Sequence, residues 1–135
     1  EFLRLQELLG KTIVFITHDF DEALRLADRI AIMKDGAIEQ CDTPDKIVMH
    51  PATEYVRKFT EDIDKARVVH ARGLSLPING ATVEGPPVDG RARIQDLARQ
   101  LVNETREVIP VADENGKVIG VMQRKDALDL LLGAG

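Results

Sequence analysis

Aromatic residues and cysteine are scarce in this 135-residue sequence: it has no tryptophan, 4% aromatic residues and a single cysteine. One cysteine excludes an internal disulfide and favours a reducing compartment, and we predict Cys41 to be a small buried thiol beside a strand. The lack of a base-stacking surface and the net charge of -5 argue against a nucleic-acid partner. No apolar run approaches the roughly 20 residues needed to span a bilayer.

The charged residues are distributed unevenly, which predicts two structural units. Residues 1–66 carry 9 basic and 14 acidic side chains, whereas residues 67–135 carry 9 of each. We place one unit at 1–60, and a linker with a second unit, called the tail below, at 61–135. Because the sequence begins without methionine and inside a helical pattern, we expect it to be a piece of a longer protein.

Hydrophobic periodicity predicts helices alternating with strands, which is an α/β fold. In the first unit it predicts a helix ended by Gly10, a strand at 12–17, a helix at 20–27, a hairpin at 30–41, and helices at 44–49 and 52–59. In the tail it predicts a loop with one short strand at 79–91, a helix at 94–102, a hairpin turning at 115–116 and a helix at 126–132. The run TIVFIT at 12–17 is typical of a parallel strand buried on both faces.

A nucleotide-binding motif is suggested first by Gly10-Lys11-Thr12. These residues resemble the end of a phosphate-binding loop, G-x-x-x-x-G-K-[ST], which must follow a strand and open a helix. Here the first glycine position is Leu5, and the order is reversed, because Gly10 ends a helix and Lys11 enters a strand. No helix N-terminus would face a phosphate, so we reject this motif.

His18 and Asp19 are better placed for a nucleotide contact. They follow the carboxyl end of the predicted parallel strand, where open α/β sheets bind ligands, and the next helix adds a positive dipole end. The His18 imidazole could hydrogen-bond a terminal phosphate and hold an attacking water; a strand-end histidine bonded to backbone is the alternative. We predict that Asp19 caps the next helix, with Glu22 as its capping-box partner.

The order of motifs in residues 12–47, TIVFITHDFDEALRLADRIAIMKDGAIEQCDTPDKI, resembles the end of the ATPase subunit of ABC importers. In that family a hydrophobic strand ends in Thr-His-Asp, and a helix rich in Asp, Glu and Ala follows. Next come Asp-Arg, a strand, a glycine turn, a second strand and Thr-Pro before a helix. The resemblance implies that His18 is the catalytic switch histidine, which contacts the γ-phosphate of ATP, and that Asp19 is structural.

The tail indicates which branch of the importer ATPases the sequence resembles. Residues 106–131, REVIPVADENGKVIGVMQRKDALDLL, resemble a CBS motif: a strand, an Asn-Gly hairpin, a strand and a helix opened by an acid, with a first strand and helix at 80–102. The implied fold is the C-terminal fragment of a P-loop ATPase domain followed by a small α+β single CBS motif. Among importer ATPases, a CBS tail is similar to the osmoprotectant branch, which takes up glycine betaine, proline betaine, proline or choline.

These resemblances imply an energy-coupling subunit that hydrolyses ATP with magnesium in its full-length parent. Its partners would be a transmembrane permease and a substrate-binding protein, and its place would be cytoplasmic, peripheral on the inner face of the cell membrane. The family's phosphate loop, signature motif and catalytic glutamate do not occur in the sequence, so we expect no ATPase activity from the chain alone. The alternative is a stand-alone CBS-type module that binds an adenosine nucleotide or a partner protein; the segment around His18 argues against it.

The tail carries a partial nucleotide pattern. CBS pairs often bind adenosine nucleotides through Gly-apolar-x-Thr/Ser-x-x-Asp, in which the acid contacts the ribose. Here Asp126 is retained as a candidate ribose contact, but Gln123 replaces the hydroxyl residue. A plain acid in the first turn of a helix, favourable with the helix dipole, is the alternative.

Other polar residues of the sequence give less specific indications of function. Four arginines of the tail could sense anionic lipid headgroups or form a solvated mixed-charge surface: Arg91, Arg93, Arg99 and Arg106. His50 and His70 have no ligand spacing around them, so we predict no metal site.

We also predict that the tail forms a homodimer through paired CBS motifs. A core this small is weakly stable and its sheet has open edges, which a second copy would cover in a two-fold interface. The prediction assumes that one motif cannot hide eight apolar side chains: Leu97, Leu101, Ile109, Val111, Val118, Val121, Leu128 and Leu131.

Overall fold

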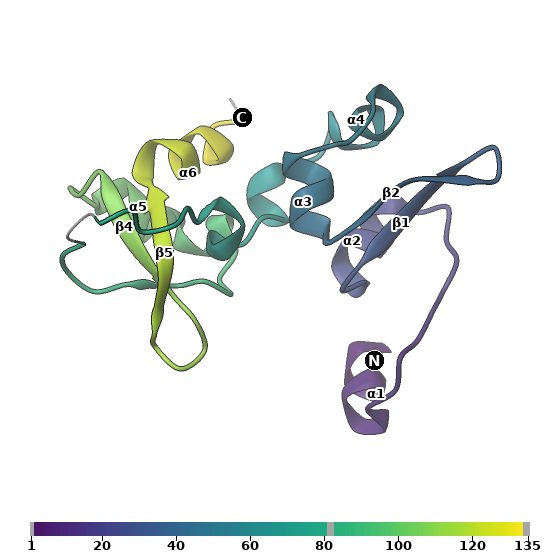
Figure 1. Cartoon of the computed structure of the whole chain (residues 1–135), viewed down its shortest axis with the longest axis horizontal. Coiled ribbons are helices and arrows are strands. Elements are labelled where there is room, and N and C mark those ends of the chain that lie inside the picture. Colours follow the sequence, from purple (N-terminus) through teal and green to yellow (C-terminus); the bar gives the residue numbers. More distant parts are fainter. Residues whose placement is uncertain (1, 81–82, 134–135) are drawn as a thin grey trace.

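Two lobes meet at a narrow neck, and the N-terminal helix α1 (Phe2–Leu9) stands apart from both (Figure 1). This computed structural model describes residues 2–80 and 83–133. The first lobe contains α2 (Phe20–Leu26), β1 (Ile30–Lys34), β2 (Ala37–Asp42), α3 (Pro44–Met49) and α4 (Glu54–Thr60). The second contains η1 (Lys65–Arg67), η2 (Ala71–Leu74), β3 (Val88–Asp89), η3 (Ile94–Leu97), α5 (Ala98–Asn103), β4 (Val108–Ala112), β5 (Val118–Gln123) and α6 (Arg124–Leu131). Helices and strands are mixed in both lobes, which confirms the α/β prediction.

The hairpin β1–β2 forms where the sequence predicts it. Asp35 and Gly36 make the turn with φ angles of 51° and 80°, the left-handed pair that a tight two-residue hairpin turn requires. The strands pair antiparallel, with a bulge between Ile32 and Met33. The helix α3 also starts as predicted, because the side chain of Thr43 accepts a hydrogen bond from the Lys46 amide. The helix α4 starts two residues later than predicted, at Glu54, where the Thr53 side chain accepts from the Val56 amide.

Cys41 is exposed, so the prediction of a buried thiol is wrong. Successive side chains of a strand point to opposite faces, and on β2 it is Gln40 that faces inward. Gln40 is 8% exposed. Its side-chain Nε2 donates to the His50 carbonyl at 3.1 Å and to Asp42 Oδ2 at 3.3 Å, and its Oε1 accepts from the Ala52 amide at 2.8 Å. This buried amide ties the hairpin to the α3–α4 loop and takes the inward position that the sequence analysis gave to Cys41.

The predicted strand at 12–17 is wrong for the described chain. These residues are extended but belong to no strand, and the side chains of Val14 and Ile16 are 87% and 95% exposed. A buried parallel strand needs a neighbour on each edge to satisfy its amides and carbonyls. The described strands pair among themselves in a two-stranded and a three-stranded sheet, and none of them pairs with residues 12–17.

The helix α1 ends as predicted at Gly10. Gly10 has a φ of 59°, and its amide donates to the Gln6 carbonyl at 2.9 Å, which is a helix C-terminus. The rejection of a phosphate loop at Gly10-Lys11-Thr12 therefore stands. With eight residues, α1 and α6 are the longest helices of the part described, in which no helix is long and apolar enough to cross a membrane.

The second lobe has the order strand, helix, strand, strand, helix that the sequence predicts for its tail. β3 pairs parallel with β4, and β4 pairs antiparallel with β5. The turn between β4 and β5 is organised by Asp113, whose carboxylate accepts hydrogen bonds from the amides of Asn115 and Lys117. The free edge of β5 is covered in part by the chain itself, because Leu76 and Val121 exchange both backbone hydrogen bonds.

Most of the apolar side chains that the dimer prediction relies on are covered within the chain. Four are buried: Leu101, Ile109, Val111 and Val121. Three more are half-buried and pack against the core: Leu97, Leu128 and Leu131. Val118 is the most open of the eight at 38% exposure. The premise that one motif cannot hide these side chains is therefore wrong for seven of them, and the dimer itself stays a prediction.

Candidate functional site

His18 lies in a turn between the extended segment 11–17 and α2. The Asp19 amide donates to the Thr17 hydroxyl at 3.0 Å, and the Glu22 amide donates to Asp19 Oδ1 at 3.1 Å. The second bond confirms that Asp19 caps α2. The first shows that Thr17, and not the Glu22 side chain, accepts from the cap amide. Two hydrogen bonds between residues close in sequence therefore hold the backbone next to His18.

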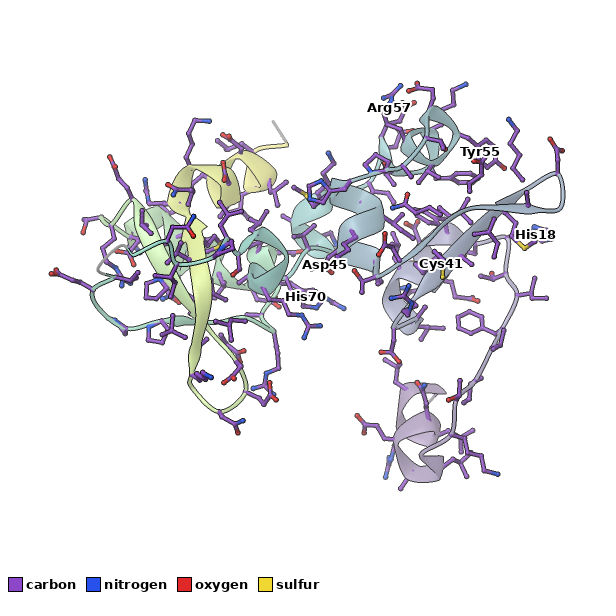
Figure 2. The ribbon with its side chains drawn as sticks, in the orientation of Figure 1. His18, Cys41, Asp45, Tyr55, Arg57 and His70 are labelled. Atoms are coloured by element: carbon purple, nitrogen blue, oxygen red, sulfur yellow. The ribbon has the colours of Figure 1, made fainter. Side chains whose placement is uncertain are left out.

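The His18 side chain is exposed, and the described residues offer its ring no hydrogen bond. It lies on the first lobe, well away from the neck (Figure 2). The alternative of a histidine bonded to backbone is therefore not what the structure contains. An exposed imidazole on a capped turn can reach a ligand that approaches from outside the chain.

A broad open hollow of about 1170 Å³ lies between α2, α3 and the neck, and it includes Asp19 but not His18. Its basic and acidic side chains come from both lobes. The basic ones are Arg25, Lys46, His50, Arg67, His70, Arg72 and Arg93. The acidic ones are Asp19, Asp21, Asp28, Asp45, Asp62 and Asp64. This balanced mixture of charges gives the hollow no preference for an anionic ligand.

Asp126 is exposed in the first turn of α6, and its side chain forms no hydrogen bond with the described residues. Gln123 is the N-cap of this helix, yet its side chain forms no capping bond. At Gly120, where the nucleotide pattern begins, a side-chain carbon would lie 2.1 Å from the Ser75 hydroxyl and 2.7 Å from the Leu76 carbonyl. The chain itself thus fills the space beside Gly120, and the carboxylate of Asp126 has only a charge interaction with Lys125 among the described residues.

The four arginines of the tail do not form a free cationic cluster. Arg91 pairs with Asp89 at 3.2 Å, and this guanidinium lowers the pKa of the Asp89 carboxyl. Arg106 pairs with Glu104 at 2.7 Å and also donates to backbone carbonyls of the 84–86 loop. The Arg106 guanidinium lowers the pKa of Glu104 to about 2. Two of the four cations therefore serve structural ion pairs, while Arg93 and Arg99 are exposed.

The sequence analysis missed the contact between Asp45 and His70. The His70 amide donates to Asp45 Oδ2 at 2.9 Å, and its ring Nδ1 lies 3.0 Å from Asp45 Oδ1. The two residues are 25 positions apart, and no local pattern connects them. Within residues 2–80 and 83–133, no three side chains of His, Cys, Asp and Glu are arranged to hold a metal ion.

In comparison with known proteins, the chain is similar to part of the ATP-binding proteins of trimethylamine N-oxide and betaine transport systems. One relative is the trimethylamine N-oxide transport system ATP-binding protein TmoW of Ruegeria pomeroyi, 69% identical over 134 residues. That match covers 99% of this chain and 38% of the relative. The sequence-based prediction of an osmoprotectant importer ATPase as relative is confirmed.

Two further relatives are ATP-binding proteins of betaine transport systems. The glycine betaine transport ATP-binding protein OpuAA of Bacillus subtilis is 39% identical, over 94% of this chain and 29% of its own length. The glycine betaine/proline betaine ATP-binding protein ProV of Escherichia coli is 37% identical, over 90% of this chain and 30% of its own length. The chain thus spans about a third of the length of these relatives.

The search of family models gives no match. Among solved structures, a cystathionine β-synthase pair domain from Shewanella oneidensis aligns with 97% of this chain and 59% of its own, at a TM-score of 0.33 and 12% identity.

Proposed function

We propose that the chain is the switch-histidine segment and tail of the ATP-binding subunit of an ABC importer for small methylated amines. The observation that carries this proposal is the 69% identity to a trimethylamine N-oxide system, which extends over both lobes. Betaine and carnitine systems are also among the relatives. Trimethylamine N-oxide, which the sequence analysis did not name, is therefore our first candidate substrate, followed by glycine betaine.

In this proposal His18 is the catalytic residue of the chain. Its imidazole hydrogen-bonds the γ-phosphate of ATP and holds the attacking water in line, while Asp19 and Thr17 fix the backbone of the turn. The exposed ring and the two hydrogen bonds around it support this role. Magnesium, when bound, neutralises charge on the phosphate oxygens, and we assign it no ligand among the described residues.

Two exposed apolar side chains within residues 12–17 support a place for this segment in a larger sheet. Val14 and Ile16 lie on the same side of an extended chain and are almost fully solvated. A continuous run of β-branched and aromatic residues is typical of a strand that is covered on both faces. We propose that these residues form the central strand of the ATPase sheet in the full-length subunit, with His18 at its carboxyl end.

The proposed partners are a transmembrane permease and a substrate-binding protein, and the proposed place is cytoplasmic, peripheral on the inner face of the cell membrane. The relatives support this, because each is the ATP-binding component of a transport system.

We propose 1–60 and 61–135 as the two units, since the neck falls between them (Figure 1). We also propose a homodimer through paired tails, which light scattering on the chain tests.

The test of the proposed function is ATP hydrolysis by the complete importer, reconstituted from the full-length subunit, its permease and its substrate-binding protein. We expect trimethylamine N-oxide or glycine betaine to raise the rate of hydrolysis when the binding protein is present. Glycine, which lacks the methyl groups of glycine betaine, is the matched control and should leave the rate unchanged. A rate that responds to neither methylated compound, or that responds equally to the control, would contradict the proposed substrate class.

A second candidate function is that the tail binds an adenosine nucleotide, with Asp126 contacting the ribose. The exposed carboxylate of Asp126, which has no other hydrogen bond in the described structure, supports this. We expect Asp126→Ala to weaken ATP or AMP binding to this chain by roughly 1.5–3 kcal/mol, the value of a hydrogen bond to a charged group. Asp129→Ala is the control, because that acid pairs with Lys125. Calorimetry that detects no binding to the parent chain would leave Asp126 a structural acid.

A further inference from the structure

The two lobes are connected across the neck by Asp45 on α3 and His70 just before η2. Figure 2 shows both residues at the neck. The Asp45 carboxylate accepts from the His70 amide at 2.9 Å, and its two oxygens lie 3.0 and 3.3 Å from His70 Nδ1. The side chains are 13% and 25% exposed. One carboxylate therefore binds both the backbone and the ring of the same residue in the other lobe.

The geometry assigns the proton on the His70 ring. A carboxylate offers only acceptors, so Nδ1 must be the donor. The Nδ1–H form of the neutral ring and the protonated ring both satisfy this contact. The neutral form with its proton on Nε2 would place a lone pair against the carboxylate.

Gly73 leaves the space in which this carboxylate sits. A side-chain carbon at Gly73 would lie 2.5 Å from Asp45 Oδ2 and 3.3 Å from Asp45 Cβ. The φ angle of Gly73 lies outside the left-handed region, so alanine fits its backbone. Alanine at this position would therefore act by displacing the carboxylate.

Contact between the elements of different lobes is less extensive than contact within each lobe. In the part of the chain described, the pairs of elements with the most extensive contact all lie within one lobe. The buried apolar side chains do continue from one lobe into the other. Apolar contact is not directional, whereas hydrogen bonds to a carboxylate have a defined distance and angle.

We propose that Asp45, His70 and Gly73 form a latch that holds the tail in one orientation relative to the first lobe. Asp45 and His70 are positioning residues, and Gly73 provides the room for their contact. Breaking the latch frees the tail to move about the neck while both lobes stay folded. The proposal is independent of nucleotide binding and of the transported substrate.

The first readout is amide hydrogen exchange in the full chain. A hydrogen bond to a charged group contributes about 1.5 kcal/mol or more, so Asp45→Ala is expected to speed exchange of the His70 amide by roughly tenfold. Gly73→Ala should do the same without removing a charge. If the alanine variant folds poorly, Asp45→Asn replaces it in this measurement, because asparagine keeps the side-chain shape and removes the charge. It should also speed exchange of the His70 amide. Asp62→Asn, an exposed acid in the linker, is the control and should leave this amide unchanged.

The second readout is the distance between the lobes. Spin labels on the exposed Cys41 and on a cysteine introduced by Val102→Cys, at an exposed site of α5, should give a narrow distance distribution in the parent chain. The distribution should broaden in Asp45→Ala and in Gly73→Ala. Three results would each overturn the proposal. They are unchanged widths of the distance distributions, an unchanged exchange rate of the His70 amide, and an equal loss of exchange protection throughout both lobes.

Discussion

His18→Ala in the full-length subunit is expected to lower the rate of ATP hydrolysis by about 10²–10³-fold, the loss typical of one transition-state hydrogen-bond donor. Nucleotide binding should be largely unchanged. The reason is that a group that holds the γ-phosphate and the attacking water acts mainly in the transition state, so its loss appears in kcat. Steady-state hydrolysis by the reconstituted importer and calorimetric titration with ATP separate the two effects.

His50→Ala is the matched control for this prediction. His50 is a second exposed histidine of the first lobe, at the C-terminus of α3, and its ring has no part in the proposed contact. Its loss should leave turnover near that of the parent protein. Near-normal turnover of the His18 variant would contradict the role assigned to His18, and so would an equal loss in both variants.

Ile16→Asp is expected to have opposite consequences in the short chain and in the full-length subunit. Ile16 is 95% exposed here, so the change should alter the stability of the 135-residue chain by no more than about 0.5 kcal/mol. In the full-length subunit we expect the same residue to lie inside a parallel sheet. An unpaired carboxylate buried there costs several kcal/mol, so the subunit should be largely unfolded or insoluble.

Chemical denaturation of both proteins measures this difference. Gln100→Asp, a change at an exposed position of α5, is the control and should be tolerated in both. If Ile16→Asp is equally mild in the full-length subunit, residues 12–17 do not form a buried strand there.

Local chemistry made several elements of this fold predictable from the sequence. The turn at Asp35-Gly36 needs two positive φ angles, and these two residue types adopt them most readily. Gly10 ends α1 for the same reason, and the hydroxyl of Thr43 caps α3 because it can accept from an amide three residues on. Each of these features depends on residues within one turn of chain.

The features that the sequence analysis missed depend on distant parts of the chain. The strand at 12–17 was predicted from its composition, but a strand also requires neighbours, and the described chain supplies none. The inward face of β2 carries Gln40 because pairing and the bulge on β1 decide which side chains point in. The Asp45–His70 contact joins residues that only the folded chain brings together.

The candidate site was predictable only in part. The sequence located His18 and its cap at Asp19 because a strand-like run followed by a capped helix is a local pattern. The exposure of the ring, and the replacement of Glu22 by Thr17 as the second capping partner, required the structure. The proposed role of His18 in hydrolysis rests on the resemblance to importer ATPases. The contacts within the chain do not include its proposed ligand, the γ-phosphate of ATP.

A structure of the full-length subunit with a non-hydrolysable ATP analogue bound tests the central claim most directly. We predict that a ring nitrogen of His18 lies about 2.7–3.2 Å from a γ-phosphate oxygen, the range of a hydrogen bond, and that residues 12–17 form a paired strand. A His18 ring far outside hydrogen-bond distance of the γ-phosphate, with residues 12–17 still solvated, would contradict the account.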